Sequence, residues 1–155
     1  MIAVALRPSL PAPAPATALL HALAAACALS LASPVFAAAP MTIDGAATVD
    51  AEGVIALITD HADLVILDNR READYAAGHI EGAIRLIDTD ITGPDVLAGV
   101  VPGTDAPVLF YCNGLSCGRA ANAVAMAVGW GYSNVHYYAL GMEEWSALGL
   151  PLVSH

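Results

Sequence analysis

The chain has 155 residues, of which 57% are hydrophobic and only 13% are charged, compared with about 25% charged residues in an ordinary soluble domain. It carries 15 acidic residues against 5 basic ones, all of them arginine, and its formal net charge is −10. This acidity excludes nucleic acid and anionic membrane surfaces as partners, because both would repel the protein. No charged residue occurs between Pro8 and Ile43, so the sequence divides into an apolar N-terminal segment and a charged remainder.

Residues 1–37 are typical of a Sec-type secretory signal peptide. Arg7 is the only charge in this segment, an apolar run extends over residues 18–32, and Pro34 follows it. Val35-Phe36-Ala37 then places compact residues at the −3 and −1 positions of a cleavage site. We therefore expect cleavage after Ala37 and a periplasmic or secreted protein made of residues 38–155.

Two alternatives to a cleaved signal peptide remain open. The first is an uncleaved membrane anchor, although the apolar run is shorter than the ~20 residues of a spanning helix and is rich in alanine rather than leucine. The second is a lipid anchor on Cys27, although apolar residues continue beyond it and the three residues before it are alanine. Cleavage after Ala37 would leave no stable membrane insertion.

Residues 38–155 are enough for one compact domain. Short apolar runs alternate with helix-like segments along them, which predicts an α/β fold with a mainly parallel central sheet and helices on both faces. We expect strands at 64–67, 83–86, 108–111 and 134–138, and helices at 51–59, 72–77, 118–128 and 142–148. Residues 88–107 are expected to be mainly loop.

Local signals support several of these boundaries. Asp50 can cap the first helix at its N-terminus, and Val54, Leu57 and Ile58 should share one face of that helix. Gly78, which follows the second helix, can adopt a left-handed capping conformation. These signals agree with repeated strand–helix units.

The segment 111–119, Tyr-Cys-Asn-Gly-Leu-Ser-Cys-Gly-Arg, carries the chemistry. A buried strand ends at Cys112, a glycine-containing loop follows, and a helix then begins. Open α/β sheets bind ligands at the carboxyl ends of their strands, and a loop entering a helix favours anions and a thiolate. Arg119 adds a positive charge, while Gly114 and Gly118 can adopt conformations that a side chain would exclude. Cys112 is therefore the candidate nucleophile; a buried inert thiol is the alternative.

Four motifs, in this order along the chain, resemble those of the rhodanese-like domain family and together cover nearly all of residues 38–155. They are the Asp-x-Arg signature in Leu67–Arg70, the Gly-His-Ile-x-Gly-Ala motif in Tyr75–Ile84, the active-site loop in Phe110–Arg119, and the Gly, Trp and Gly-Leu-Pro pattern in Tyr138–Leu152. Each motif alone is a weak signal. Their order and spacing make the combination specific.

The resemblance implies a single rhodanese-like domain, residues 38–155, that takes a sulfane sulfur from a donor such as thiosulfate and passes it to a thiophilic acceptor. By this resemblance Cys112 holds the sulfur as a persulfide, and Arg119 helps to attract the anionic donor. Asp68 and Arg70 would support the loop through an ion pair. The backbone that would cradle the persulfide belongs to Asn113, Gly114, Leu115, Ser116, Cys117 and Gly118.

The loop departs from the family pattern in length, because six residues lie between Cys112 and Arg119. The additional length includes Cys117, and two cysteines this close can form a disulfide in an oxidising compartment. Three functions stay open: a periplasmic sulfurtransferase, a thiol–disulfide protein in which Cys117 resolves a modified Cys112, and a non-catalytic binding module. Phosphatase-type hydrolysis ranks below these, because no acid for the leaving group is identifiable in the loop.

The sequence predicts no cofactor and no metal site. Cys112, Cys117 and the scattered histidines match no spacing of zinc ligands. The expected partners are a small anionic sulfur donor and a thiol acceptor, a partner protein is also open, and nucleic acid is not expected.

Overall fold

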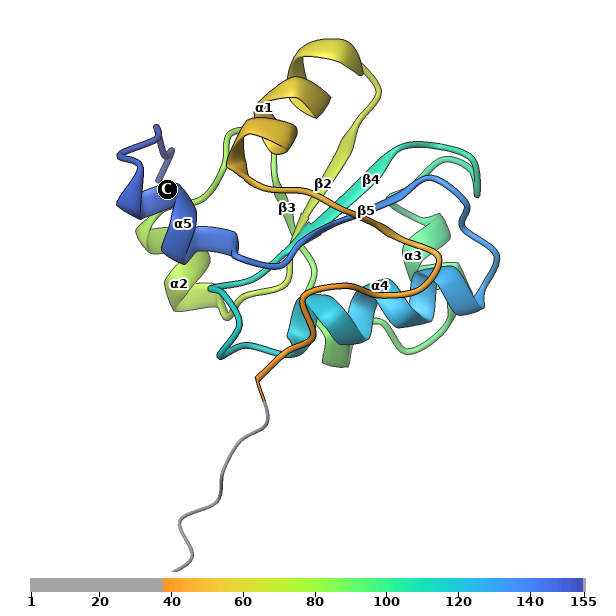
Figure 1. Cartoon of the computed structure of the whole chain (residues 1–155). Helices are drawn as coiled ribbons and strands as arrows, with labels where there is room; N and C mark the ends of the chain where they lie inside the picture. The colour runs from red at the N-terminus through yellow and green to blue at the C-terminus, as the bar shows by residue number, and fades with distance from the viewer. Residues whose placement is uncertain (1–37, 155) are drawn as a thin grey trace, which may run out of the picture. The chain divides into compact units, whose positions relative to one another are not determined.

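The computed structural model describes residues 38–154, so the expected signal peptide, residues 1–37, lies outside the described residues. Within residues 38–154, no helix is long and apolar enough to cross a membrane. A five-stranded sheet has the order β1-β5-β4-β2-β3, and every pairing in it is parallel (Figure 1). The strands are β1 (Ala47–Thr48), β2 (Val65–Asp68), β3 (Ile84–Arg85), β4 (Val108–Tyr111) and β5 (Val135–Tyr138).

Helices cover both faces of this sheet. In the described part of the chain they are α1 (Ala51–Asp60), α2 (Glu72–Ala77), α3 (Pro94–Ala98), α4 (Arg119–Gly129) and α5 (Gly141–Ala147), with a short 3-10 helix, η1 (Asp88–Asp90). Helices α1, α2 and α5 lie on one face, and α3 and α4 lie on the other (Figure 1). The predicted α/β class with a parallel sheet between two helical layers is confirmed.

The hydrophobic core is divided by the sheet into two clusters. Successive residues of a strand point to opposite faces, so Val108 and Phe110 of β4 pack toward α3 and α4, whereas Leu109 and Tyr111 pack toward α1 and α5. All four side chains are fully buried. Because both faces are covered, the central strands are continuous apolar runs, and this made them readable in the sequence.

The predicted cap of α1 is confirmed, but one residue of its predicted packing face is misplaced. The Gly53 N–H donates to Asp50 Oδ1 at 2.9 Å, and Val54 and Leu57 are buried as expected. Ile58, however, is 42% exposed, so its assignment to the buried face was wrong. One residue of helix turns the side chain by about 100°, which carries position 58 from the core edge toward solvent.

One further expectation differs from the structure, and three short elements, η1, α3 and β1, were not predicted. Gly78 has φ 164° and ψ 134°, an extended conformation rather than the predicted left-handed cap, because the chain continues directly into the bridge between His79 and Val153. The region 88–107 contains η1 and α3, and α3 starts at Pro94, a residue preorganised for a first helical position. Strand β1 was not predicted, because two exposed residues are too few to carry a periodicity.

Candidate active site

The candidate site is built where β2 and β4 end side by side. In their parallel pairing Asp68 lies opposite Tyr111, and the Asn69 N–H then donates to the Tyr111 carbonyl at 2.9 Å. Strand alternation sends Asp68 and Tyr111 toward one face of the sheet, and Asn69 and Cys112 toward the other. The strand ends therefore present two different sets of side chains.

The first set is a buried ionic network around Asp68 and Arg70. Arg70 Nη2 lies 2.6 Å from Asp68 Oδ2 and also donates to the Gly78 carbonyl at 2.7 Å. The Tyr111 hydroxyl donates to the same Asp68 oxygen at 2.6 Å and accepts the Ile80 N–H at 3.3 Å. The ion pair expected between Asp68 and Arg70 is thus present, and it is shielded from water, since the two residues are 0% and 4% exposed.

Burial and the Asp68 charge set the ionisation of this network. Burial by itself lowers the pKa of Arg70, but the hydrogen bond and charge of Asp68 outweigh it, so the pKa is raised. Burial, with the Asp68 charge, raises the pKa of Tyr111 far above its ordinary value. Arg70 therefore stays a cation and Tyr111 a neutral hydrogen-bond donor at physiological pH.

The second set is the loop that begins at Cys112. The sulfurs of Cys112 and Cys117 are joined in a disulfide whose Cα atoms lie 6.2 Å apart. Both residues are buried, at 3% and 8% exposure. The Cys117 N–H donates to the Gly114 carbonyl at 2.9 Å, which closes a turn inside the loop. The sequence did not decide whether these two cysteines form a disulfide, and the structure shows that they do.

Helix α5 holds the first half of the loop. The Met142 N–H donates to the Cys112 carbonyl at 3.0 Å, and the Glu143 N–H donates to the Asn113 carbonyl at 2.8 Å. Gly141, with φ 53°, makes this docking possible, because a Cβ there would collide with the backbone of Cys112. The loop is therefore clamped against the start of α5 rather than free in solvent.

Ala39, which is followed by the anchored Pro40, holds the other half of the loop. The Ala39 N–H donates to the Leu115 carbonyl at 2.7 Å, and the Tyr137 hydroxyl of β5 donates to the Pro40 carbonyl at 3.1 Å. Ala39 is buried in the core beside α4, and Leu115 packs against the same cluster. The loop is fixed from two sides by segments far from it in the sequence.

The two loop glycines differ from each other. Gly114 has φ 156°, which few other residues adopt, and a Cβ there would meet the Glu143 side chain. Gly118 caps α4 with φ −75°, and open space surrounds the position of a Cβ. Gly118 therefore does not use the conformational freedom that a glycine has, because it has the ordinary geometry of a residue about to enter a helix.

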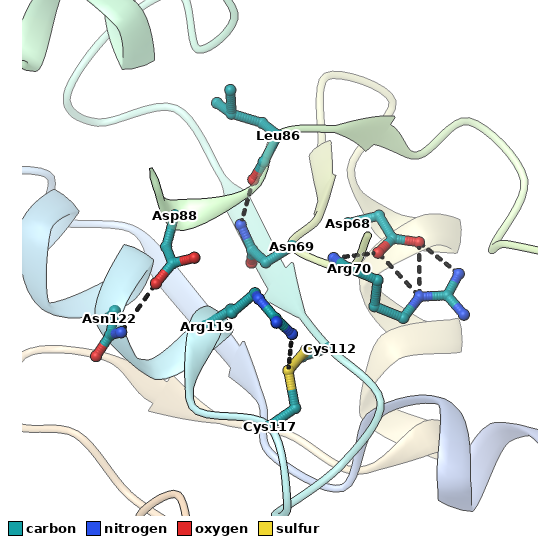
Figure 2. The surroundings of a disulfide bond; sticks show 9 residues. All are labelled: Asp68, Asn69, Arg70, Leu86, Asp88, Cys112, Cys117, Arg119 and Asn122. Atoms are coloured by element: carbon teal, nitrogen blue, oxygen red, sulfur yellow. Dashed lines mark hydrogen bonds and ion pairs between the residues drawn. A yellow bond between two sulfur atoms is a disulfide. The ribbon is translucent and has the colours of Figure 1, made fainter. Parts of the chain in front are cut away.

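Arg119, the first residue of α4, faces the sulfur of Cys117. Its Nη1 donates to Cys117 Sγ at 3.4 Å, as Figure 2 shows. The ion pairs in the described part of the chain are Arg70–Asp68 and Arg85–Glu72, so no carboxylate of residues 38–154 neutralises Arg119 at ion-pair distance. Its positive charge is available to a sulfur anion.

Sequence reasoning missed Asn69 as a neighbour of the loop cysteine. Asn69 is fully buried, and its Nδ2 donates to the Leu86 carbonyl at 2.6 Å (Figure 2). Its Oδ1 has no hydrogen-bond partner among the described residues, and the same holds for Asp88 Oδ1. The sequence feature that could have pointed to Asn69 is its position between Asp68 and Arg70, one residue beyond the end of β2.

An open surface depression of about 470 Å³ lies beside the loop, on the side of α2 and α5. Asn113, Arg70 and Glu143 contribute to its wall. Among the predicted loop residues Ser116 is exposed, whereas Leu115 is half-buried. Glu143 was not predicted, and only its place two residues after the motif residue Gly141 pointed to it.

A family model described as "Rhodanese-like domain" matches residues 50–148. Protein YibN of Escherichia coli K12, itself described as uncharacterized, is 33% identical over 92 residues, which are 59% of this chain and 62% of YibN. The chain thus corresponds to less than two thirds of the length of this relative.

Two solved structures of sulfurtransferases share the fold. The thiosulfate sulfurtransferase of Pseudomonas aeruginosa superposes with a TM-score of 0.60 and 24% identity, over 70% of this chain and 20% of that one. The polysulfide-sulfur transferase homodimer of Wolinella succinogenes superposes with a TM-score of 0.57 and 20% identity, over 72% of this chain and 80% of that one. At these identities the likeness concerns the fold.

Proposed function

The chain belongs to the rhodanese-like domain family, and from that premise we propose that it is a sulfurtransferase whose nucleophile is Cys112. The observation that carries the proposal is the position of Cys112, which directly follows the carboxyl end of β4 and opens a loop that ends at Arg119. Open α/β sheets bind ligands at this edge. Two proteins of the same fold are named for transferring sulfur from thiosulfate and from polysulfide.

The proposed reaction needs a reduced loop, because the Cys112 sulfur is bonded to Cys117 in the disulfide. Once reduced, the Cys112 thiolate attacks the sulfane sulfur of thiosulfate. The sulfur–sulfur bond of thiosulfate breaks, sulfite leaves, and a persulfide forms on Cys112. A thiophilic acceptor then attacks the outer sulfur, and Cys112 returns as a thiolate. The Arg119 charge supports the approach of the donor against the negative charge of the protein.

The test is the conversion of thiosulfate and cyanide to sulfite and thiocyanate by the full chain. We expect activity after reduction, little activity while the disulfide is closed, and background rates from Cys112→Ser. Cys117→Ser is the matched control, because it removes the disulfide and leaves Cys112 in place. If reduced wild type and Cys112→Ser produce thiocyanate at the same rate, sulfur transfer to cyanide is ruled out and a non-catalytic binding module becomes the better description.

The disulfide favours a second candidate, a thiol–disulfide protein that cycles Cys112 and Cys117 without taking up sulfur. The release of sulfite after incubation of the reduced protein with thiosulfate, in the absence of air, separates the two candidates. Sulfur transfer releases sulfite and requires Cys112. A purely redox protein releases no sulfite and closes its disulfide only when an oxidant is supplied.

We further propose that the protein acts in the periplasm or outside the cell, on a small anionic sulfur donor and a thiol acceptor. The support is the signal-like sequence of residues 1–37 and the presence of paired cysteines. Fractionation of cells, with N-terminal sequencing of the recovered protein, tests this. An N-terminus at Ala38 is expected, and recovery of the full-length chain from the cytoplasm contradicts it.

A further inference from the structure

The second cysteine of the loop has a position that the transfer reaction above does not use. The disulfide shows that the sulfurs of Cys112 and Cys117 reach each other, with Cα atoms 6.2 Å apart. The loop between them is clamped at Cys112 and Asn113 by α5 and at Leu115 by Ala39. Cys117 is therefore held close to any sulfur carried by Cys112, which gives an intramolecular reaction a high effective concentration.

The electrostatic environment also distinguishes the two sulfurs. Arg119 Nη1 contacts Cys117 Sγ at 3.4 Å, and no hydrogen bond joins Arg119 to Cys112 in the described structure. A neighbouring guanidinium stabilises a thiolate. When the disulfide is open, Arg119 is placed to favour the reactive form of Cys117.

We propose that Cys117 discharges the Cys112 persulfide as hydrosulfide, so that the protein is a sulfide-releasing reductase of sulfane sulfur. This rests on the proposed function, because the persulfide must first form. The Cys117 thiol loses its proton, and its sulfur attacks the inner sulfur on Cys112. The bond between the inner and outer sulfurs breaks, and the outer sulfur leaves as hydrosulfide with that proton. Two cysteine thiols are oxidised to the disulfide, and the sulfane sulfur is reduced by two electrons.

The cycle then requires a dithiol reductant as its second substrate. A thiolate of the reductant opens the disulfide through a mixed disulfide, and its second thiol releases the protein in the dithiol form. Arg119 makes Cys117 the better leaving group in this exchange, because it stabilises the departing thiolate. Over one cycle thiosulfate and a dithiol give sulfite, hydrosulfide and a disulfide.

The test is a single turnover of the full chain. The protein is reduced, freed of reductant in the absence of air, and mixed with thiosulfate without any acceptor. Sulfite, hydrosulfide and intact mass are followed together. We expect equal amounts of sulfite and hydrosulfide and a protein that has lost two hydrogens. Cys117→Ser should release sulfite without hydrosulfide and gain one sulfur.

The outcomes separate this proposal from the proposed function. If wild type releases sulfite and remains a stable persulfide without hydrosulfide, the role of Cys117 is overturned while sulfur transfer stands. If wild type releases no more sulfite than Cys112→Ser, sulfur uptake itself fails. Because the wild-type result decides between these cases, the test holds even if the Cys117→Ser variant folds poorly.

The role of Arg119 is tested by rapid mixing of the reduced protein with thiosulfate. The quantity measured is the ratio of the rate of hydrosulfide release to the rate of sulfite release. Arg119→Gln should lower this ratio roughly tenfold, since it removes a charge-assisted contact to the attacking sulfur, and Arg119→Lys should recover part of the loss. Arg71→Gln removes an equal charge from an exposed position at the N-terminus of α2 and should leave the ratio unchanged. An unchanged ratio in Arg119→Gln overturns the assignment of Arg119 to this step.

Discussion

The two faces of the sheet differ at the ends of the same two strands. Toward α1, α2 and α5, Asp68, Arg70 and Tyr111 form a buried network in which the charges are paired. Toward α4, Cys112 and Cys117 form a disulfide beside an arginine without a carboxylate partner among residues 38–154. A shift of one residue along a strand separates these environments.

This difference indicates that the Asp68–Arg70 network mainly stabilises the fold, whereas the reactive groups lie in the loop that contains Cys112 and Cys117. On the network face, the hydrogen bonds of Asp68 and Arg70 satisfy the buried charges, which fixes the positions of β2 and β4. Buried polar atoms without a hydrogen-bond partner among the described residues occur on both faces, Asn69 Oδ1 and Asp88 Oδ1 toward α4 and His136 Nδ1 and Tyr138 Oη toward α1 and α5. What distinguishes the loop face is the guanidinium of Arg119, which contacts a sulfur instead of a carboxylate.

The largest expected effect comes from disrupting the buried Asp68–Arg70 network. Asp68→Ala leaves the buried Arg70 charge unpaired, so we expect the free energy of unfolding to fall by about 3–5 kcal/mol. Glu72→Ala is the control, because it removes a pair with Arg85 in which the Glu72 side chain is 74% exposed, and such pairs contribute little. Urea denaturation of both variants measures the contrast. Equal losses would show that burial of the pair does not matter.

The second prediction concerns the clamp between the loop and α5. Gly141→Ala places a Cβ against the Cys112 backbone at φ 53°, and we expect a loss of about 3 kcal/mol together with faster alkylation of reduced Cys112. Gly149→Ala has a similar φ of 65° but open space around its Cβ. It should lose only about 1–2 kcal/mol and leave alkylation unchanged. Matching alkylation rates in the two variants would contradict the clamp.

The third prediction concerns the disulfide itself. It closes a loop between residues five positions apart, which corresponds to about 2 kcal/mol of stabilisation in the chain-entropy description. Reduction of the wild type should lower its free energy of unfolding by this amount, and the same treatment of Cys117→Ser should have no effect. A wild type that is equally stable in both redox states would indicate that the closed loop is strained by a compensating amount.

The smallest expected effect concerns the face of the sheet that carries the Asp68–Arg70 network. On this face His136 of β5 lies opposite Leu109 of β4. Burial, assisted by the charge of His61, lowers the pKa of His136. The unfolded chain therefore binds a proton first as the pH falls below about 6.5, and the stability of the fold decreases from there until the folded state is also protonated. His136→Gln should reduce the loss of stability between pH 7 and 5, measured by denaturation at each pH. An unchanged pH profile would contradict this.

The sequence was sufficient for the fold class and for most elements. The strands β2, β4 and β5 are runs of large apolar residues because two helical layers cover the sheet. The start of α1 was predictable because Asp50 is a typical N-cap residue. Strand β1 and helix α3 escaped prediction, since short elements are specified by their neighbours rather than by their own periodicity. The candidate loop was recognised from its order of strand, cysteine, glycine and helix.

The sequence by itself determined a single α/β domain with a cysteine at a strand end, because hydrophobic periodicity and motif order are local properties of the chain. It left open whether Cys112 and Cys117 are bonded, since spacing along the chain does not fix the separation of two sulfurs. Only the tertiary structure decided that bond, the contact of Arg119 with Cys117, and the clamps from Ala39 and α5. Each of these joins atoms whose distance depends on how the layers pack around the sheet.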